Sequence, residues 1–154
     1  VEARSTAAIA IFSSLLLAIF GALLIYLFRD PMIQLYTEEN NVVQLARQLL
    51  MFVVFFLIFD ATQSTAIGTL RGYKDTQVPM KIALVSYWVI GLPLGCTLGF
   101  GWLAPPLEVY GFWIGLAAGV GCASILLCYR LFKLSGDPVL IRSLSATADP
   151  EPAP

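Results

Sequence analysis

The sequence predicts an all-α, polytopic integral membrane protein with four transmembrane helices. Of its 154 residues, 58% are hydrophobic and only 12% are charged, and the mean hydropathy is +0.82. A soluble domain carries about a quarter of its residues as charged side chains, so a water-soluble globule is excluded. The few charges gather in short clusters between long apolar runs. Four of these runs reach the length of about 20 residues that a helix needs to cross a bilayer.

The four apolar runs give the predicted spans within a transmembrane bundle over residues 1–133. We place the spans at about 5–28, 48–70, 82–104 and 109–130. A secretory signal is the alternative for the first run, but that run is longer than the roughly 7 to 15 apolar residues of a signal sequence. Pro31 is expected to end the first helix, because proline disfavours helical geometry at the residue before it.

The connections between the spans differ in composition. An amphipathic stretch over 32–47 is expected to lie partly in the membrane interface. The second connection, 71–79, is compact, charged and punctuated by glycine and proline. Residues 134–154 end in a run of proline, alanine and acidic residues, which offers little apolar surface to offset the entropy of ordering. We therefore predict a disordered cytoplasmic tail there.

Basic residues are distributed unequally between the two sides of the predicted bundle. Two of the nine Lys and Arg residues, Arg29 and Arg47, lie on one side. The other side holds both termini and the second connection, and it carries Arg4, Arg71, Lys74, Lys81, Arg130, Lys133 and Arg142. The positive-inside rule counts basic residues in short loops. We therefore expect both termini on the cytoplasmic face of the inner (plasma) membrane.

Glycine recurs at every fourth residue in the last two spans. Such ridges let helices approach closely, and close approach matters in lipid because association depends on van der Waals contact. Pro93 interrupts the third span and is expected to kink it, because it removes a backbone hydrogen bond. The ridge residues are Gly91, Gly95 and Gly99 in the third span and Gly111, Gly115 and Gly119 in the fourth.

The second span contains one acid, Asp60, near its middle. An unpaired charge at the bilayer centre costs several kcal/mol, so this carboxyl must face protein or water. Gln63 and Ser64 fall on the same helical face at 100° per residue and could orient it. A titrating or cation-binding carboxyl is the functional interpretation, since Asp60 can be neutral when desolvated and charged when water or a cation reaches it. A carboxyl kept neutral by a hydrogen bond to a neighbouring helix is the structural alternative.

Several other function classes are disfavoured by composition. The net charge is −1 and no basic block is present, so nucleic acid is not an expected partner. No histidine occurs, and the three cysteines lie in apolar runs without zinc-type spacing. The sequence has neither the paired acids nor the nucleophile elbow that would indicate an enzyme. No cofactor is expected.

A longer set of residues resembles the MATE (multidrug and toxic compound extrusion) family, in its NorM-like branch. The set comprises Asp60-Ala-Thr-Gln, then Gly68-Thr-Leu-Arg71-Gly72-Tyr73-Lys74-Asp75-Thr76, then Tyr87-Trp88, Gly91-Leu92-Pro93-Leu94-Gly95 and Gly111-Phe-Trp-Ile-Gly115-Leu. The resemblance covers nearly the whole chain except the tail. It aligns the chain with the last four of twelve helices, in the C-terminal lobe, and so implies that this is an incomplete part of a transporter.

The resemblance implies secondary active efflux of amphipathic cationic drugs in exchange for protons or sodium, by alternating access. Asp60 stands where sodium-coupled members use an acid to bind the cation, so a sodium ion at Asp60 is the one metal implied. Phe56 replaces a tyrosine found there in some members, which removes one oxygen from such a site. Arg71, Lys74 and Asp75 match the family's cytoplasmic loop, and we interpret them as structural. The implied partners are the coupling ion, the drugs, the remaining helices and the lipid bilayer.

Two alternatives stay open from the sequence. The first is a related lipid-linked oligosaccharide flippase, which would be expected to carry more basic residues within its spans. The second is a small four-helix membrane protein that acts as an oligomer or an assembly subunit, with Asp60 holding helices together. The coupling ion and the drug spectrum are not predicted.

Overall fold

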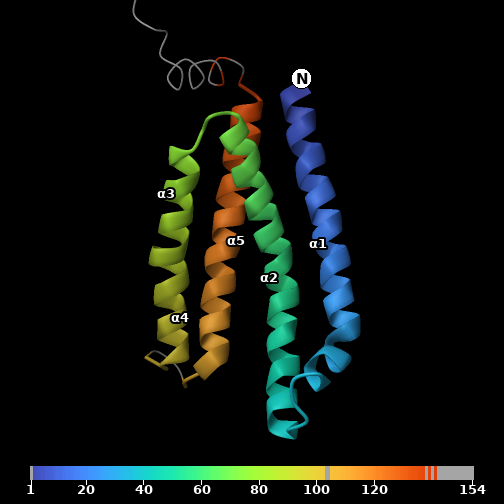
Figure 1. Ribbon diagram of the computed structural model, residues 1–154. Coiled ribbons are helices and arrows are strands. Elements are labelled where there is room, and N and C mark those ends of the chain that lie inside the picture. The colour runs from blue at the N-terminus through green and yellow to red at the C-terminus, as the bar shows by residue number, and fades with distance from the viewer. Residues whose placement is uncertain (1, 103–104, 138, 140, 142–154) are drawn as a thin grey trace, which may run out of the picture.

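The computed structural model describes residues 2–102, 105–137, 139 and 141 (Figure 1). Its elements are α1 (Glu2–Gln34), α2 (Asn40–Gly72), α3 (Gln77–Val85), η1 (Ser86–Gly91), α4 (Leu92–Gly99) and α5 (Glu108–Ser135). Because α3, η1 and α4 follow one another without a break, they form one continuous rod. The described residues thus make four rods, each long and apolar enough to cross a membrane. This confirms the predicted all-α membrane fold.

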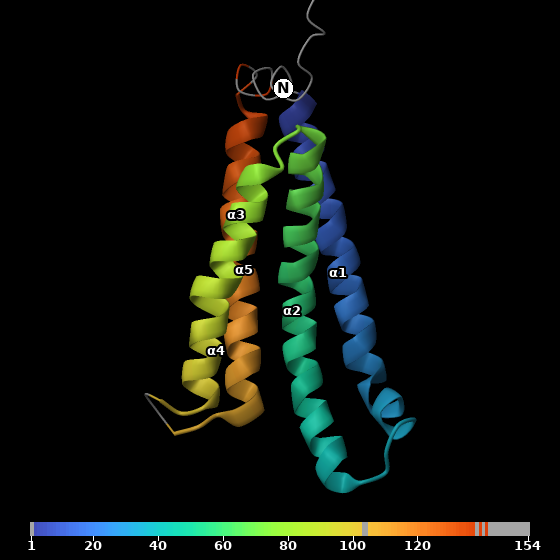
Figure 2. The same ribbon diagram turned by 60° about the vertical axis from the view of Figure 1, so that its left-hand side comes forward.

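The four rods run alternately up and down. The N-terminus, the α2–α3 connection and the C-terminal end of α5 lie at one end of the bundle, and the other two connections lie at the opposite end (Figures 1 and 2). Helix α2 packs against both α1 and α5, and α5 also packs along η1 and α4. Helices α2 and α5 therefore form the centre of this arrangement.

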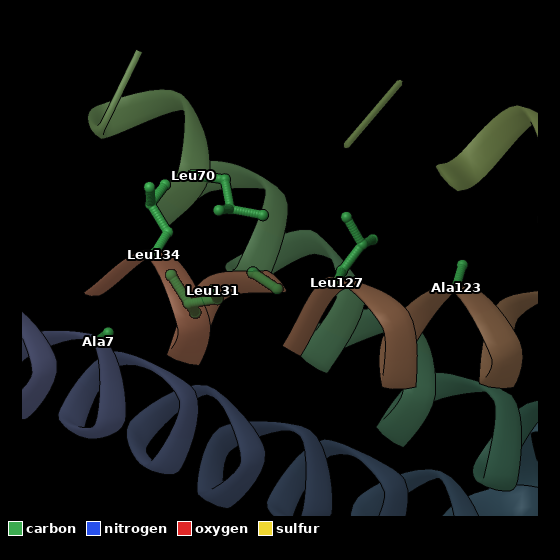
Figure 3. Close-up of a cluster of buried hydrophobic side chains, with 7 residues drawn as sticks. Ala7, Leu70, Ala123, Leu127, Leu131 and Leu134 are labelled. Carbon is green, nitrogen blue, oxygen red and sulfur yellow. The ribbon is translucent and has the colours of Figure 1, made fainter. Parts of the chain in front are cut away.

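The buried hydrophobic core lies near the end that carries the N-terminus. Small residues at the contacts let α1, α2 and α5 converge there, while leucines fill the space between them (Figure 3). In lipid this packing is stabilised by van der Waals contact. The cluster consists of Ala7, Ala66, Leu70, Ala123, Leu127, Leu131 and Leu134.

The two glycine ridges face each other between the rod α3–η1–α4 and helix α5. A Cβ atom added at Gly115 would lie 2.3 Å from the Cα of Gly95, and one at Gly111 would lie 2.4 Å from the backbone nitrogen of Gly99. No real Cβ atom tolerates such distances from backbone. The ridges are therefore the contact surface at which these two rods pack most closely.

Pro31 does not end the first helix, so that expectation is wrong. Helix α1 continues to Gln34, one turn further, and the Leu35 amide still donates to the carbonyl of Pro31 at 3.2 Å. Proline removes only its own donor, and close to a helix end that loss affects one hydrogen bond. The chain turns back after this last turn.

The stretch over 32–47, expected to lie partly in the membrane interface, is divided between two helices, and its place in the membrane stays a prediction. Its first residues belong to α1, and α2 begins at Asn40 and runs unbroken to Gly72. Arg47 of α2 is held to Asp30 of α1, with both its Nε and its Nη2 at 2.9 Å from Oδ1. This ion pair bridges the two helices near the α1–α2 connection.

At the C-terminal end, α5 extends beyond the predicted span. Leu134 and Ser135, assigned to the tail from the sequence, are buried parts of this helix. Residues 142–154, the greater part of the predicted tail, lie outside the described residues.

The third rod contains a π-helical segment, η1, directly before Pro93. The Leu92 amide donates to the carbonyl of Tyr87, five residues back, instead of four. A wider turn accommodates a proline ring, which would otherwise clash with the carbonyl four residues earlier. The kink expected at Pro93 stays a prediction.

Candidate functional site

Asp60 lies on α2 and is half-buried. Leu70, near the end of α2, follows ten residues later, and a rise of 1.5 Å per residue separates the two by about 15 Å. This is half the thickness of a hydrocarbon core of about 30 Å. If the membrane boundary lies at Leu70, Asp60 lies at the bilayer midplane.

The carboxyl of Asp60 has no partner in the part of the chain that the structure describes. Neither a hydrogen bond nor an ion pair joins it to another described side chain, and no basic residue occurs between Gln48 and Leu70. A charge in this position can be compensated by an ion, a proton, water or a group outside the described residues. The carboxyl is therefore available for binding within this bundle.

Two contacts fix the helix around Asp60. The Ser124 hydroxyl of α5 donates to the carbonyl of Phe59 at 2.7 Å. One turn before Asp60, the ring of Phe56 meets Trp113 of α5 edge to face, with centroids 6.3 Å apart. The half-buried carboxyl is thus held on a stretch of α2 that is fastened to α5 both by its backbone and by an aromatic contact.

Gln63 and Ser64 occupy different environments, although the sequence places both near Asp60. Gln63 is buried, and its Oε1 accepts a hydrogen bond from the Tyr87 hydroxyl of η1 at 3.1 Å. Ser64 is exposed on the surface of α2. Gln63 therefore ties α2 to the third rod, whereas Ser64 is the polar neighbour that stays open beside the carboxyl.

The connection after α2 is closed by a buried ion pair. Arg130 Nε of α5 donates to Asp75 Oδ2 at 2.9 Å, and only 3% of the Asp75 side chain is exposed. The amide of Asp75 also donates to the Leu70 carbonyl at 3.0 Å, and Lys74 adopts a left-handed conformation at φ 61°. These are the features of a Schellman C-cap. The structural role that the sequence predicts for this loop stays a prediction.

Arg71 and Lys74 lie elsewhere in the same loop region. Both are exposed. Arg71 is the last basic residue of α2 and lines a hollow beside α3, together with Thr76. Asp75 thus pairs with Arg130 of α5, which the sequence identified only as one of the basic residues that predict the orientation.

The polar contacts that cross between rods were not predicted from the sequence. Tyr87 and Ser124 each lie in an apolar run, and a tyrosine or serine there needs a hydrogen-bond partner because lipid offers none. That rule marks them as interhelical, but the partner of each depends on how the helices are rotated. In the described residues, no group of three or more His, Cys, Asp or Glu is arranged to hold a metal ion.

Comparison with known proteins identifies the class. Residues 1–97 match the MatE family, and the four apolar rods agree with a transporter of that kind. The chain belongs to the MATE family of membrane transporters, which confirms the resemblance and the prediction of a transporter in place of an enzyme.

Individual relatives are bacterial multidrug resistance proteins. The chain is 46% identical over 102 residues to multidrug resistance protein NorM of Vibrio cholerae, an alignment that covers 65% of this chain and 22% of the relative. It is 40% identical over 133 residues to multidrug resistance protein PmpM of Pseudomonas aeruginosa, covering 86% of this chain and 28% of the relative. NorM of Aliivibrio fischeri is 42% identical over 108 residues, or 70% and 24% of the two chains. The chain thus spans about a quarter of the length of the relatives it matches.

Proposed function

We propose that this chain is part of a secondary active multidrug exporter, which exchanges amphipathic organic cations for protons or sodium by alternating access. Family membership supports the transport class, and relatives named as multidrug resistance proteins favour drugs over lipid-linked oligosaccharides. The remaining helices of the complete protein would form the rest of the pathway, with both termini in the cytoplasm.

Asp60 is the residue that we propose couples the ion to the drug. The observation that carries this proposal is its position: the one charge between Gln48 and Leu70, half-buried, without a partner among the described residues, on a helix fastened to α5. A desolvated carboxylate gains stability when a proton, a sodium ion or a cationic drug binds it. Competition for one negative charge links two opposite fluxes, because each ligand favours the conformation to which it binds better.

Gln63 and Ser64 have separate parts in this proposal. Ser64 lies one turn from Asp60 and is exposed, so its hydroxyl can supply an oxygen to a bound cation. Gln63 is already bonded to Tyr87, so it holds the position of α2 relative to the third rod. A sodium ion, if it is the coupling ion, would be held by Asp60 and by oxygens of this kind.

Replacement of Asp60 by asparagine tests the proposal. Asp60→Asn keeps the size of the side chain and its hydrogen bonding but removes the charge. In cells that lack other exporters, the complete protein with this change should export drug at least about tenfold more slowly. The reason is that a buried charge interaction worth over about 1.4 kcal/mol is removed. Its amount in the membrane should be unchanged.

Thr62→Val is the matched control. The Thr62 hydroxyl donates to the Ile58 carbonyl of its own helix at 2.8 Å, so this variant removes a neighbouring polar group without removing a hydrogen bond between helices. Efflux should persist in it. Near-normal efflux by Asp60→Asn at equal abundance would show that Asp60 only holds helices together.

A further inference from the structure

A groove with one charged end follows the third rod of the bundle. Its first part, about 330 Å³, lies between the end of α2 and α3 and is lined by Arg71, Thr76 and apolar side chains that include Met80 and Leu84. Its second part, about 410 Å³, continues between η1, α4 and α5. Tyr87 and Trp88 line both parts, so the two parts are neighbours along the rod, and we call them together the α3 groove.

The inner part of the α3 groove is apolar. Gly91 and Gly95 line it and contribute no side chain, while Phe112 and Leu116 of α5 form the opposite wall. The same glycines bring the rods into backbone contact. The groove therefore has a smooth floor suited to an extended hydrocarbon chain.

The outer end carries a positive charge. Arg71 is exposed, and no hydrogen bond or ion pair joins its guanidinium to a described residue. The nearby acid, Asp75, is buried and paired with Arg130, so it does not neutralise Arg71. Thr76, which carries a hydroxyl, lines the same end. An anion with several acceptor oxygens, such as a phosphate, matches a guanidinium beside a hydroxyl.

The length of the groove fits an amphipathic ligand that enters from the membrane surface. Thr76 and Gly95 are 19 residues apart, or about 28 Å along a helix. Arg71 and Thr76 lie at helix ends, where a headgroup lies, and the path from them runs toward the membrane interior. One leaflet holds about 15 Å of hydrocarbon, which corresponds to about ten residues of helix. A single acyl chain that begins beside Thr76 therefore ends near Tyr87 and Trp88, where the two parts of the groove meet.

We propose that the α3 groove binds one anionic phospholipid. Its phosphate contacts Arg71 and Thr76, and one acyl chain follows Met80, Leu84 and Trp88 toward Gly91. A cationic drug is disfavoured because Arg71 repels it. If a further helix of the complete protein covered the groove, it would bury the Arg71 charge. An unpaired buried charge is costly, so such a helix would have to supply an acid. This site is separate from Asp60 and does not depend on the transport proposal.

Native mass spectrometry of the complete protein in detergent tests the headgroup. Phosphatidylglycerol and phosphatidylcholine with the same acyl chains would be titrated separately. We expect one phosphatidylglycerol to bind at least about tenfold more tightly than phosphatidylcholine, since a hydrogen bond to a charged group contributes enough for that factor. Arg71→Gln should remove the preference. Lys81→Gln, which removes an exposed charge from α3 outside the groove lining, should retain it.

Fluorescence quenching tests where the chain lies. Phosphatidylglycerol brominated in mid-chain should quench the fluorescence of Trp88, which is the part of the emission that the Trp88→Phe variant lacks. Leu84→Trp, which fills the groove, should weaken lipid binding. Inorganic phosphate at millimolar concentration should not displace the lipid, because it lacks the acyl chain. Equal binding of both lipids, an unchanged preference in Arg71→Gln, displacement by phosphate alone, or no quenching at Trp88 would each overturn the proposal. The last result would mean that another helix covers the groove.

Discussion

At the residue scale, two ion pairs have the same distance between nitrogen and oxygen but differ in how far their side chains are buried. Arg130 and Asp75 meet at 2.9 Å with 22% and 3% of their side chains exposed, and Arg47 and Asp30 meet at 2.9 Å with 46% and 44% exposed. Exposed pairs contribute about 0 to 1 kcal/mol because water screens them. Removing one partner of a buried pair leaves an uncompensated charge and costs more. The buried pair is therefore expected to contribute more to the free energy of unfolding than the exposed pair.

Double-mutant cycles measure this difference in the free energy of unfolding in mixed micelles. For Asp75→Ala and Arg130→Ala we expect a coupling energy of about 1 to 3 kcal/mol. For Asp30→Ala and Arg47→Ala, the matched exposed pair, we expect less than about 1 kcal/mol. Equal coupling in both cycles would show that the loop after α2 is not held by its buried ion pair.

At the element scale, the contact between the third rod and α5 depends on the absence of side chains. A Cβ atom at Gly115 would meet backbone at 2.3 Å, whereas one at Gly121 of the same helix would lie 3.9 Å from the Phe59 ring. The first position has no space for a methyl group, because the neighbouring atoms belong to a backbone that cannot rotate away. The second has ordinary van der Waals room.

Alanine at these two positions should therefore have different effects on the stability of the protein. Gly115→Ala should destabilise the complete protein by about 1 to 3 kcal/mol, since extra atoms in a packed contact force the helices apart. Gly121→Ala should be neutral or stabilising by up to about 1 kcal/mol, because alanine favours a helix. Thermal unfolding in detergent distinguishes them. A loss at Gly121 equal to that at Gly115 would contradict the packing described.

The sequence predicted the elements better than their ends. Four apolar runs identified the rods and two glycine ridges identified packing surfaces, because length, hydropathy and spacing are local properties. Pro31 was misread as the end of the first helix, since a proline one turn from a helix end costs only one hydrogen bond. The partners of Tyr87, Ser124 and Arg130 could not be predicted, because they depend on the rotation of helices that are distant in sequence.

The same limit applies to the candidate site. Asp60 was identified because a charge in an apolar run is conspicuous. The different environments of Gln63 and Ser64 were not foreseen, since helical spacing gives a shared face but not which neighbour covers each part of it. The sequence also did not foresee that Asp75 pairs with Arg130 on another helix.

At the scale of the whole molecule, the alternating rods put the N-terminus, the α2–α3 connection and the C-terminal end of α5 at one end (Figure 1). Most basic residues belong to that end, so the positive-inside rule predicts that it faces the cytoplasm. The opposite end carries Arg29 and Arg47, and Asp30 forms ion pairs with both.

Cysteine labelling tests this orientation. In a complete protein without other cysteines, an impermeant maleimide added outside should modify a cysteine at Glu39, in the α1–α2 connection, and spare one at Gln77, at the start of α3. Permeabilised cells should label both and so show that each site is reactive. Modification of Gln77→Cys alone from outside would reverse the predicted topology.

The central claim is that an ion gradient drives drug movement through Asp60. The most direct measurement is drug accumulation by proteoliposomes that contain the complete protein, with a proton or a sodium gradient as the only source of energy. We predict accumulation with one of these gradients, its collapse when an ionophore dissipates the gradient, and none with Asp60→Asn. Gradient-driven accumulation by Asp60→Asn at the wild-type rate, or wild-type transport that is independent of both gradients, would contradict the account.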